Sequence, residues 1–210
     1  MCRNIERILV AKDEIQEMCQ RLGREITEDY RGKKVILICV LKGAFVFLAD
    51  LIREIDLPCE VDFMSVSSYS GQHTTGVVKI IKDLDTDIAE KHVIIVEDIV
   101  DSGLTLKHLS ELLKTRNPAS IRICTAFDKP SRRKVEIFVD YVGMEIPDEF
   151  IVGYGLDLGE RYRNLPEVAV LSTAEIPESE ETSGENAKSV STDGDEEEGR
   201  ENLNVEAASE

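Results

Sequence analysis

The residues best suited to chemistry lie close together, between positions 93 and 105. An apolar run there is followed by two adjacent carboxylates, Glu97 and Asp98, then by Asp101 and a short segment with two hydroxyls and one glycine. Adjacent carboxylates can accept hydrogen bonds from sugar hydroxyls or hold a hydrated Mg²⁺. A glycine-containing loop that opens a helix offers unpaired N–H groups to a phosphate. The stretch therefore predicts a site that takes a phosphate at one end and a diol or a metal ion at the other.

Simpler interpretations of the same residues stay open at this point. Glu97 and Asp98 could be a solvated strand end, and Ser102 or Thr105 could simply cap the following helix. A receiver-type phosphoacceptor site also has adjacent acids after a strand, but normally near the start of its domain, whereas this pair is in the middle of the chain. A nucleotide triphosphatase is disfavoured, because neither GxxxxGKS nor GxxxxGKT occurs.

The elements that must position this stretch are strands and helices in alternation. Residues 13–27 carry apolar side chains at helical spacing, with Asp13 available as a cap, so they predict an amphipathic helix. The continuous apolar run Val35–Leu41 is typical of a strand buried on both faces of a parallel sheet. A second helix is predicted from Gly43 to about Ile55. A third is predicted on an apolar face formed by Leu106, Leu109, Leu112 and Leu113.

The other predicted strands are residues 61–68, 77–82, 93–96, 121–126, 137–141 and 150–154. Strands alternating with helices predict an α/β fold, with a mostly parallel twisted sheet flanked by helices on both faces. Ligands of such sheets bind beyond the carboxyl ends of the strands, which is where Glu97 and Asp98 are expected.

The negative charge of the chain is concentrated at one end. The formal net charge is −17, and residues 173–210 hold thirteen acidic residues against two basic ones. That segment has no aromatic residue and few apolar ones, so it cannot bury enough surface to offset the entropy of ordering. We therefore expect one domain over residues 1–172 and a disordered acidic tail over residues 173–210.

Composition also disfavours several classes of protein. Val35–Leu41 is the longest apolar run and is far shorter than the roughly 20 residues of a membrane-spanning helix. Residues 1–12 lack a signal-peptide pattern. The five cysteines are odd in number and form no CxxC, which favours free thiols in a reducing compartment. A net-acidic chain is a poor general binder of nucleic acid. A cytoplasmic protein without membrane or nucleic-acid partners is expected.

Residues 93–105 resemble the phosphoribosyl-diphosphate-binding signature of the type I phosphoribosyltransferases. Other segments are similar to the branch that acts on 6-oxopurines, the hypoxanthine (hypoxanthine-guanine) phosphoribosyltransferases. They match its pyrophosphate loop, its mobile catalytic loop, its purine-recognition lysine and its C-terminal hood: residues 40–44, 67–69 with 76–80, 128–130, and 142–157 with 160–166. The resemblance is colinear over roughly residues 5–172. It implies the type I fold, with a small hood subdomain built from the N-terminal segment and about residues 143–166.

The resemblance also implies an activity, namely purine salvage. The 5-phosphoribosyl group of 5-phospho-α-D-ribose 1-diphosphate would pass to hypoxanthine, and also to guanine, giving IMP or GMP and diphosphate. Mg²⁺ would be the cofactor, and the chain would form a homodimer or homotetramer. A regulatory protein of the same fold, which senses phosphoribosyl diphosphate or purine without turnover, is the alternative. It is less favoured because Lys42, Asp101 and Lys129 are all present. Adenine, orotate or uracil specificity would lack the context of Asp128 and Lys129.

Individual roles follow from the same resemblance. Asp101 would act as general base or proton relay near the purine N7. Lys129 would donate to the exocyclic O6 of the base. Phe150 would stack on the purine, and the backbone of Ile151 would pair with it. The purine-binding set is Lys129, Phe150, Ile151 and Asp157.

The phosphoribosyl-diphosphate site is implied in the same way, with Glu97, Asp98 and Asp157 as metal ligands and Arg163 rather than Arg161 at the pyrophosphate. A cis peptide is implied between Leu41 and Lys42. The full set is Leu41, Lys42, Gly43, Glu97, Asp98, Asp101, Ser102, Gly103, Leu104, Thr105 and Arg163. Ser68 and Tyr69, in a mobile loop over residues 68–76, would exclude water from the reaction centre.

Overall fold

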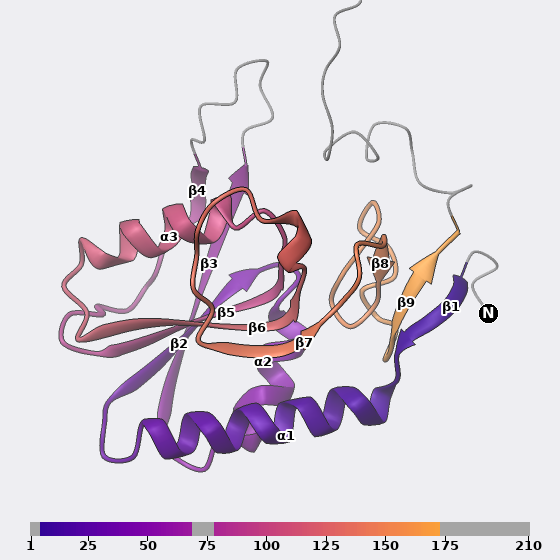
Figure 1. Ribbon diagram of the computed structural model, residues 1–210. Coiled ribbons are helices and arrows are strands. Elements are labelled where there is room, and N and C mark those ends of the chain that lie inside the picture. Colours follow the sequence, from indigo (N-terminus) through magenta and orange to yellow (C-terminus); the bar gives the residue numbers. More distant parts are fainter. Residues whose placement is uncertain (1–4, 69–77, 173–210) are drawn as a thin grey trace, which may run out of the picture. The chain divides into compact units, whose positions relative to one another are not determined.

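The computed structural model describes residues 5–68 and 78–172 (Figure 1). These residues all belong to the first of the two units into which the chain divides, Met1–Glu175 and Ile176–Glu210. The predicted acidic tail and most of the predicted loop over residues 68–76, including Tyr69, lie outside the described residues. Within the described ranges, no helix combines the length and the apolar character needed to cross a membrane.

A six-stranded sheet forms the centre of the described chain, in the order β4-β3-β2-β5-β6-β7. Its neighbours pair in parallel except β3 and β4, which pair antiparallel, so the predicted mostly parallel sheet is confirmed. The strands are β2 (Val35–Leu41), β3 (Cys59–Ser68), β4 (Val78–Lys82), β5 (His92–Val100), β6 (Ser120–Asp128) and β7 (Tyr141–Glu145).

Helices cover both faces of this sheet, as the alternation predicts. Helices α1 (Lys12–Asp29) and α2 (Phe45–Leu51) lie on one face and α3 (Leu104–Lys114) lies on the other (Figure 1). Alternate residues of β5 enter the two cores: Ile94 and Val96 pack with α1 and α2, whereas Val93 and Ile95 pack with α3. Side chains alternate between the faces of a strand, so a continuous apolar run serves both cores.

The ends of the helices differ from the predictions in detail. Ala11, not Asp13, is the N-cap of α1, and its N–H donates to the Glu14 carboxylate at 2.7 Å. The predicted second helix is shorter, because α2 stops at Leu51 and passes into a 3₁₀ turn, η1 (Ile52–Glu54).

Two strands extend beyond the apolar runs that predicted them. β5 continues past Val96 to Val100, and β6 continues to Asp128. The backbone ladder runs on through polar residues, with Glu97 opposite Thr125 and Ile99 opposite Phe127. Glu97 and Asp98 therefore lie inside the last part of the strand and not after it.

The predicted strand over residues 137–141 is wrong. That segment is irregular up to Asp140, and β7 begins only at Tyr141. Val135 and Ile137 instead turn their side chains toward Gly103, where a Cβ would lie 3.3 and 2.8 Å from their methyl groups. Ile137, one of the apolar residues that suggested a strand, thus covers the loop between β5 and α3.

A second, antiparallel sheet has the order β1-β9-β8. Its strands are β1 (Ile5–Val10), β8 (Ile151–Val152) and β9 (Val168–Leu171). Of these, only β8 was predicted, as the longer strand over residues 150–154; β1 and β9 were not. This sheet brings the first described residues beside the last ones and carries the segment that leads to Asp157.

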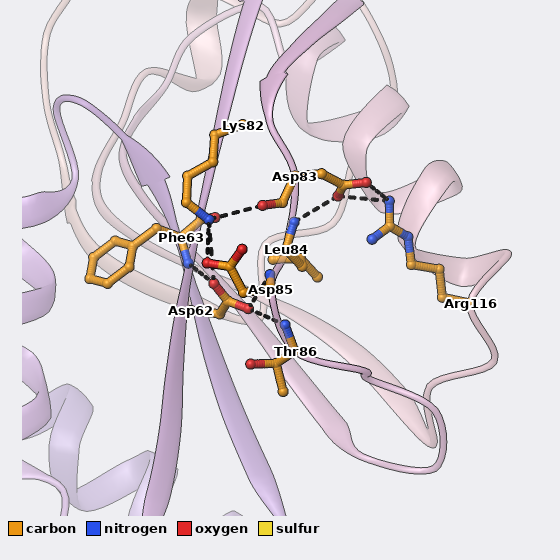
Figure 2. Close-up of polar contacts among 8 residues, drawn as sticks. All are labelled: Asp62, Phe63, Lys82, Asp83, Leu84, Asp85, Thr86 and Arg116. Carbon is orange, nitrogen blue, oxygen red and sulfur yellow. Dashed lines mark hydrogen bonds and ion pairs between the residues drawn. The ribbon is translucent and has the colours of Figure 1, made fainter.

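β4 is the edge strand of the main sheet as described. Figure 2 shows the polar contacts of a buried carboxylate, Asp62, beside it. Asp62 is 4% exposed and accepts N–H groups from Phe63, Asp85 and Thr86 at 2.7–2.9 Å. Burial alone raises the pKa of Asp62, but these hydrogen bonds outweigh it and hold that pKa below its usual value. The chain that leaves β4 is thereby fixed to β3.

Candidate active site

The loop between β5 and α3 has the backbone of an anion site. Gly103 is the N-cap of α3 and has a φ of 78°, a left-handed conformation that favours glycine. The Ser102 hydroxyl accepts only a long hydrogen bond, 3.4 Å, from the N–H of Leu104. The first N–H groups of a helix have no partner within the helix. The start of α3, including Thr105, is therefore able to bind a phosphate.

One pocket, about 270 Å³ in volume, gathers predicted residues from four separate segments. Val40 and Val66 also line it, and these two were not predicted. The predicted residues that line it are Leu41, Lys42, Gly43, Glu97, Asp98, Thr105, Asp157 and Arg163. Asp101, Ser102, Gly103 and Leu104 belong to the loop that leads directly into Thr105.

A larger hollow of about 850 Å³ lies beside α1 and α2. It shares Arg163 with the smaller pocket, but its lining includes neither Glu97 nor Asp98. Volume alone would favour the larger hollow. The smaller pocket is the candidate active site, because, of the two, only it joins the adjacent carboxylates of β5 to the glycine-capped start of α3.

Close backbone contacts hold the walls of the candidate site together. The peptide between Leu41 and Lys42 is cis, as expected. A Cβ on Gly43 would lie 1.5 Å from the Asp98 carboxylate, and a Cβ on Gly155 would lie 2.1 Å from the carbonyl oxygen of Gly43. The predicted pyrophosphate loop is therefore packed directly between the end of β5 and the segment that leads to Asp157.

The cations of the pocket are paired with carboxylates. Arg163 Nη2 lies 2.7 Å from Asp157, and Arg163 donates to the carbonyl of Gly155 at 2.7 Å. Lys42 Nζ lies 2.8 Å from Glu160, a partner that was not predicted. Arg161 is exposed and does not line the pocket, whereas Arg163 does.

The carboxylates of β5 lie in an environment that disfavours their ionised forms. Burial, together with the neighbouring charge of Asp98, raises the pKa of Glu97 well above its usual range. Burial also raises the pKa of Asp98 to about 6. A divalent cation beside these groups would relieve both effects.

The residues present fit Mg²⁺. Glu97, Asp98 and Asp157 offer only oxygen donors, which Mg²⁺ prefers. In the part of the chain that the structure describes, no three metal-ligating side chains form a closed cluster. Mg²⁺ commonly uses one or two carboxylates and completes its shell with water and substrate phosphates, so an open set of this kind suits it.

Of the predicted purine residues, Asp157 lines the 270 Å³ pocket, whereas Lys129, Phe150 and Ile151 do not. Lys129 is 5% exposed, its Nζ donates to the carbonyl of Glu149 at 2.7 Å, and burial lowers its pKa. Its own N–H donates to the carbonyl of Val100, one residue before Asp101. Phe150 is half-buried, and Ile151 is buried in β8. The backbone of Lys129 is thus bound to the last residue of β5, directly before the loop between β5 and α3.

Two arginines beside Asp101 were not predicted. Arg132 Nε lies 3.1 Å from the Asp101 carboxylate, and Arg133 donates to the Asp101 carbonyl. The doubled arginine after Lys129 was the available signal in the sequence. Of the two residues predicted to exclude water, Ser68 is the last residue of β3 and Tyr69 lies outside the described residues.

Comparisons with known proteins agree with this geometry. A family model described as a phosphoribosyl transferase domain matches residues 8–158. The hypoxanthine-guanine phosphoribosyltransferase of Bacillus subtilis (strain 168) is 52% identical over 175 residues, which cover 83% of this chain and 97% of that protein. The hypoxanthine phosphoribosyltransferase of Salmonella typhimurium is 54% identical over 164 residues, which cover 77% of this chain and 92% of the relative.

Solved structures point the same way. The crystal structure of a hypoxanthine phosphoribosyltransferase from Staphylococcus aureus superposes with a TM-score of 0.78 at 48% identity, covering 80% of this chain and 92% of the other. The structure of the Trypanosoma cruzi hypoxanthine phosphoribosyltransferase in complex with the product IMP superposes with a TM-score of 0.79 at 38% identity. The match covers 83% of this chain and 98% of the other. The fold, the residues of the site and the shared sequence lead to one conclusion: this chain belongs to the phosphoribosyltransferase family, in its hypoxanthine phosphoribosyltransferase branch.

Proposed function

We propose that this chain transfers the 5-phosphoribosyl group of 5-phospho-α-D-ribose 1-diphosphate to hypoxanthine and guanine, releasing diphosphate and forming IMP or GMP. The observation that carries the proposal is the 270 Å³ pocket, which unites the start of α3, the carboxylates of β5 and two cations. A donor with a phosphate, a diol and a diphosphate needs these three kinds of group side by side.

Different residues of the pocket would bind different parts of the donor. The loop from Asp101 to Thr105 takes the 5′-phosphate through its N–H groups. Glu97 and Asp98 accept the ribose hydroxyls or hold Mg²⁺, and Asp157 holds a second Mg²⁺. Mg²⁺, when bound, neutralises charge that develops on the departing diphosphate. Lys42 and Arg163 exchange their carboxylate partners for the diphosphate.

The base would be bound by Lys129, Phe150 and Ile151 and activated by Asp101. Lys129 is a donor only, so it suits the O6 acceptor of a 6-oxopurine and not the 6-amino group of adenine. Phe150 stacks on the ring and the Ile151 backbone pairs with it. Asp101 takes the proton from N7 as the new bond forms. Ser68 and Tyr69 keep their proposed role of excluding water.

We also place the enzyme in the cytoplasm, as a homodimer or homotetramer. Cys19, Cys39 and Cys124 are buried and unpaired, which suits a reducing compartment. Light scattering of the purified chain measures the assembly directly.

A panel of four bases tests the activity. Protein with Mg²⁺ and the phosphoribosyl donor is incubated with hypoxanthine, guanine, xanthine or adenine, and nucleotides are separated by chromatography. IMP and GMP are expected, and adenine should give no product. Failure with both hypoxanthine and guanine, while the donor still binds in calorimetry, would instead favour the sensing protein without turnover.

A further inference from the structure

Residues 129–134, which follow the last strand residue of β6, hold the carbonyl groups of the phosphate-binding loop. Arg133 Nη1 donates to the carbonyl of Val100 at 2.7 Å and to that of Asp101 at 2.5 Å. The N–H of Lys134 donates to the carbonyl of Ser102 at 3.0 Å. Three consecutive carbonyls of the loop are thus bound from one side by one short segment.

Holding these carbonyls also orients the loop's N–H groups. A peptide unit is planar, and its C=O and N–H point in opposite directions. The bonds to Val100, Asp101 and Ser102 therefore direct the N–H groups of the next residues, 101–103, away from the segment that holds them. An anion site needs several N–H groups that face the same way before the ligand arrives.

Arg133 is itself firmly held. Its Nη2 pairs with Asp128, the last residue of β6, which is 7% exposed. The Arg133 side chain is 18% exposed. Because Asp128 balances its charge and the two loop carbonyls use Nη1, Arg133 acts on the backbone and is not spare for a phosphate. A guanidinium reaches these acceptors as a fork, which a lysine ammonium cannot do.

Apolar packing closes the same side of the loop. A Cβ on Gly103 would lie 2.8 Å from Ile137 Cγ2, 3.3 Å from Val135 Cγ2 and 3.6 Å from Arg133 Cδ. The loop therefore has a filled side against residues 133–137, and no room to turn a peptide over on that side.

We propose that Arg133, held by Asp128, is a positioning residue for the phosphoribosyl donor: by binding the carbonyls of Val100 and Asp101, it presets the N–H groups that take the 5′-phosphate. This rests on the proposed function, since the donor is what the loop would bind. Arg133 itself does not contact the ligand. Loss of Arg133 should lower the affinity for ligands that carry the 5′-phosphate. The affinity for ligands that bind only at Lys42 and Arg163 should not change.

The test compares two probes, ribose 5-phosphate and inorganic diphosphate with Mg²⁺, by calorimetry on the full chain. Arg133→Met should weaken ribose 5-phosphate by about 10- to 100-fold, the range that loss of charge-assisted hydrogen bonds produces. Diphosphate affinity should stay within about twofold of the unchanged chain. In turnover, the KM for the donor should rise more than kcat falls. Arg161→Met, which removes an exposed arginine, is the matched control and should leave both affinities unchanged.

Unaltered ribose 5-phosphate binding in a folded Arg133→Met protein would overturn the inference, and so would equal weakening of both probes, since a general structural role predicts that. If Arg133→Met does not fold, Arg133→Lys carries the test, because it keeps the charge beside Asp128 without the fork; unchanged affinity there would likewise overturn it. A chain that made no IMP yet bound ribose 5-phosphate in an Arg133-dependent way would contradict the proposed function and support this inference.

Discussion

Two turns of this molecule are each organised by one charged side chain, and the two charges have opposite signs. At the edge of the main sheet, the Asp62 carboxylate collects the N–H groups of Phe63, Asp85 and Thr86 (Figure 2). At the end of β5, the Arg133 guanidinium collects the carbonyls of Val100 and Asp101.

The sign decides what each turn can do. Asp62 binds the N–H groups of Phe63, Asp85 and Thr86, so these groups are not available to an anion and the contact anchors the chain that leaves β4. Arg133 consumes carbonyls, so its turn keeps N–H groups for a ligand. Both turns follow the same rule, that backbone polar groups need partners when they are buried. Only the second leaves a donor surface open.

The largest expected effect is on the ligand-binding turn. Asp101→Asn should lower kcat by about 10²- to 10⁴-fold, because the amide cannot accept the proton from the base. Ribose 5-phosphate affinity should change little, since the Asp101 carbonyl that Arg133 holds is retained. Steady-state kinetics and calorimetry measure the two quantities, and a collapse of binding would reassign Asp101 to donor recognition.

Asp62→Ala should act on stability instead. It leaves three partly buried N–H groups of the edge turn without their acceptor, which should cost about 3 kcal/mol of unfolding free energy. Urea denaturation of the unchanged and variant chains measures the loss. At saturating substrate and 25 °C, kcat of the folded variant should remain close to that of the unchanged chain; a kcat loss as large as that of Asp101→Asn would erase the contrast between the two turns.

Lys129→Ala distinguishes the role of the Lys129 side chain from that of its backbone N–H, which binds the end of β5. The backbone N–H that holds Val100 remains, whereas the ammonium offered to the base is lost. The KM for hypoxanthine should rise by about tenfold, as for one lost hydrogen bond from a charged donor. Ribose 5-phosphate should bind as before. Unchanged base kinetics would mean that the purine binds elsewhere.

A smaller effect concerns pH. Because the folded-state pKa of Asp62 lies below its usual value, ionised Asp62 contributes stability above the unfolded pKa of about 3.9. That contribution is lost as pH falls through the lower, folded pKa. The Asp62→Asn variant has no carboxylate here and so lacks this pH-dependent contribution. The difference in unfolding free energy between the unchanged chain and Asp62→Asn should therefore decrease from pH 6 toward pH 3. Denaturation curves across that range measure the gap, and a gap that widened with acid would reverse the sign.

Much of this molecule could be predicted from local patterns. Val35–Leu41 is a strand with the predicted ends, because a parallel strand buried on both faces must be apolar throughout. Eight of the 17 predicted site residues line one pocket. Six of them lie at the carboxyl end of β2 or β5 or at the start of α3, as expected for a ligand site of a parallel sheet.

What could not be predicted depends on contacts between distant segments. β1 pairs with β9, with Ile5 opposite Leu171, and neither short run carries a local signal of its partner. Residues 137–141 have the composition of a strand, yet Ile137 serves to cover Gly103. Arg133 binds carbonyl groups, which every residue possesses, so no side-chain pattern marks its targets.

The contact between Gly43 and Gly155 limits which substitutions this sequence can accept at the two positions. Each position is filled by a neighbouring backbone or carboxylate where a methyl group would sit, and the two lie in segments more than a hundred residues apart. Alanine at position 155 would push its segment away from the backbone of Gly43, and alanine at position 43 would displace the Asp98 carboxylate. In a saturation library selected for growth on salvaged purine, both codons should stay invariant while the exposed neighbours Phe45 and Arg161 vary.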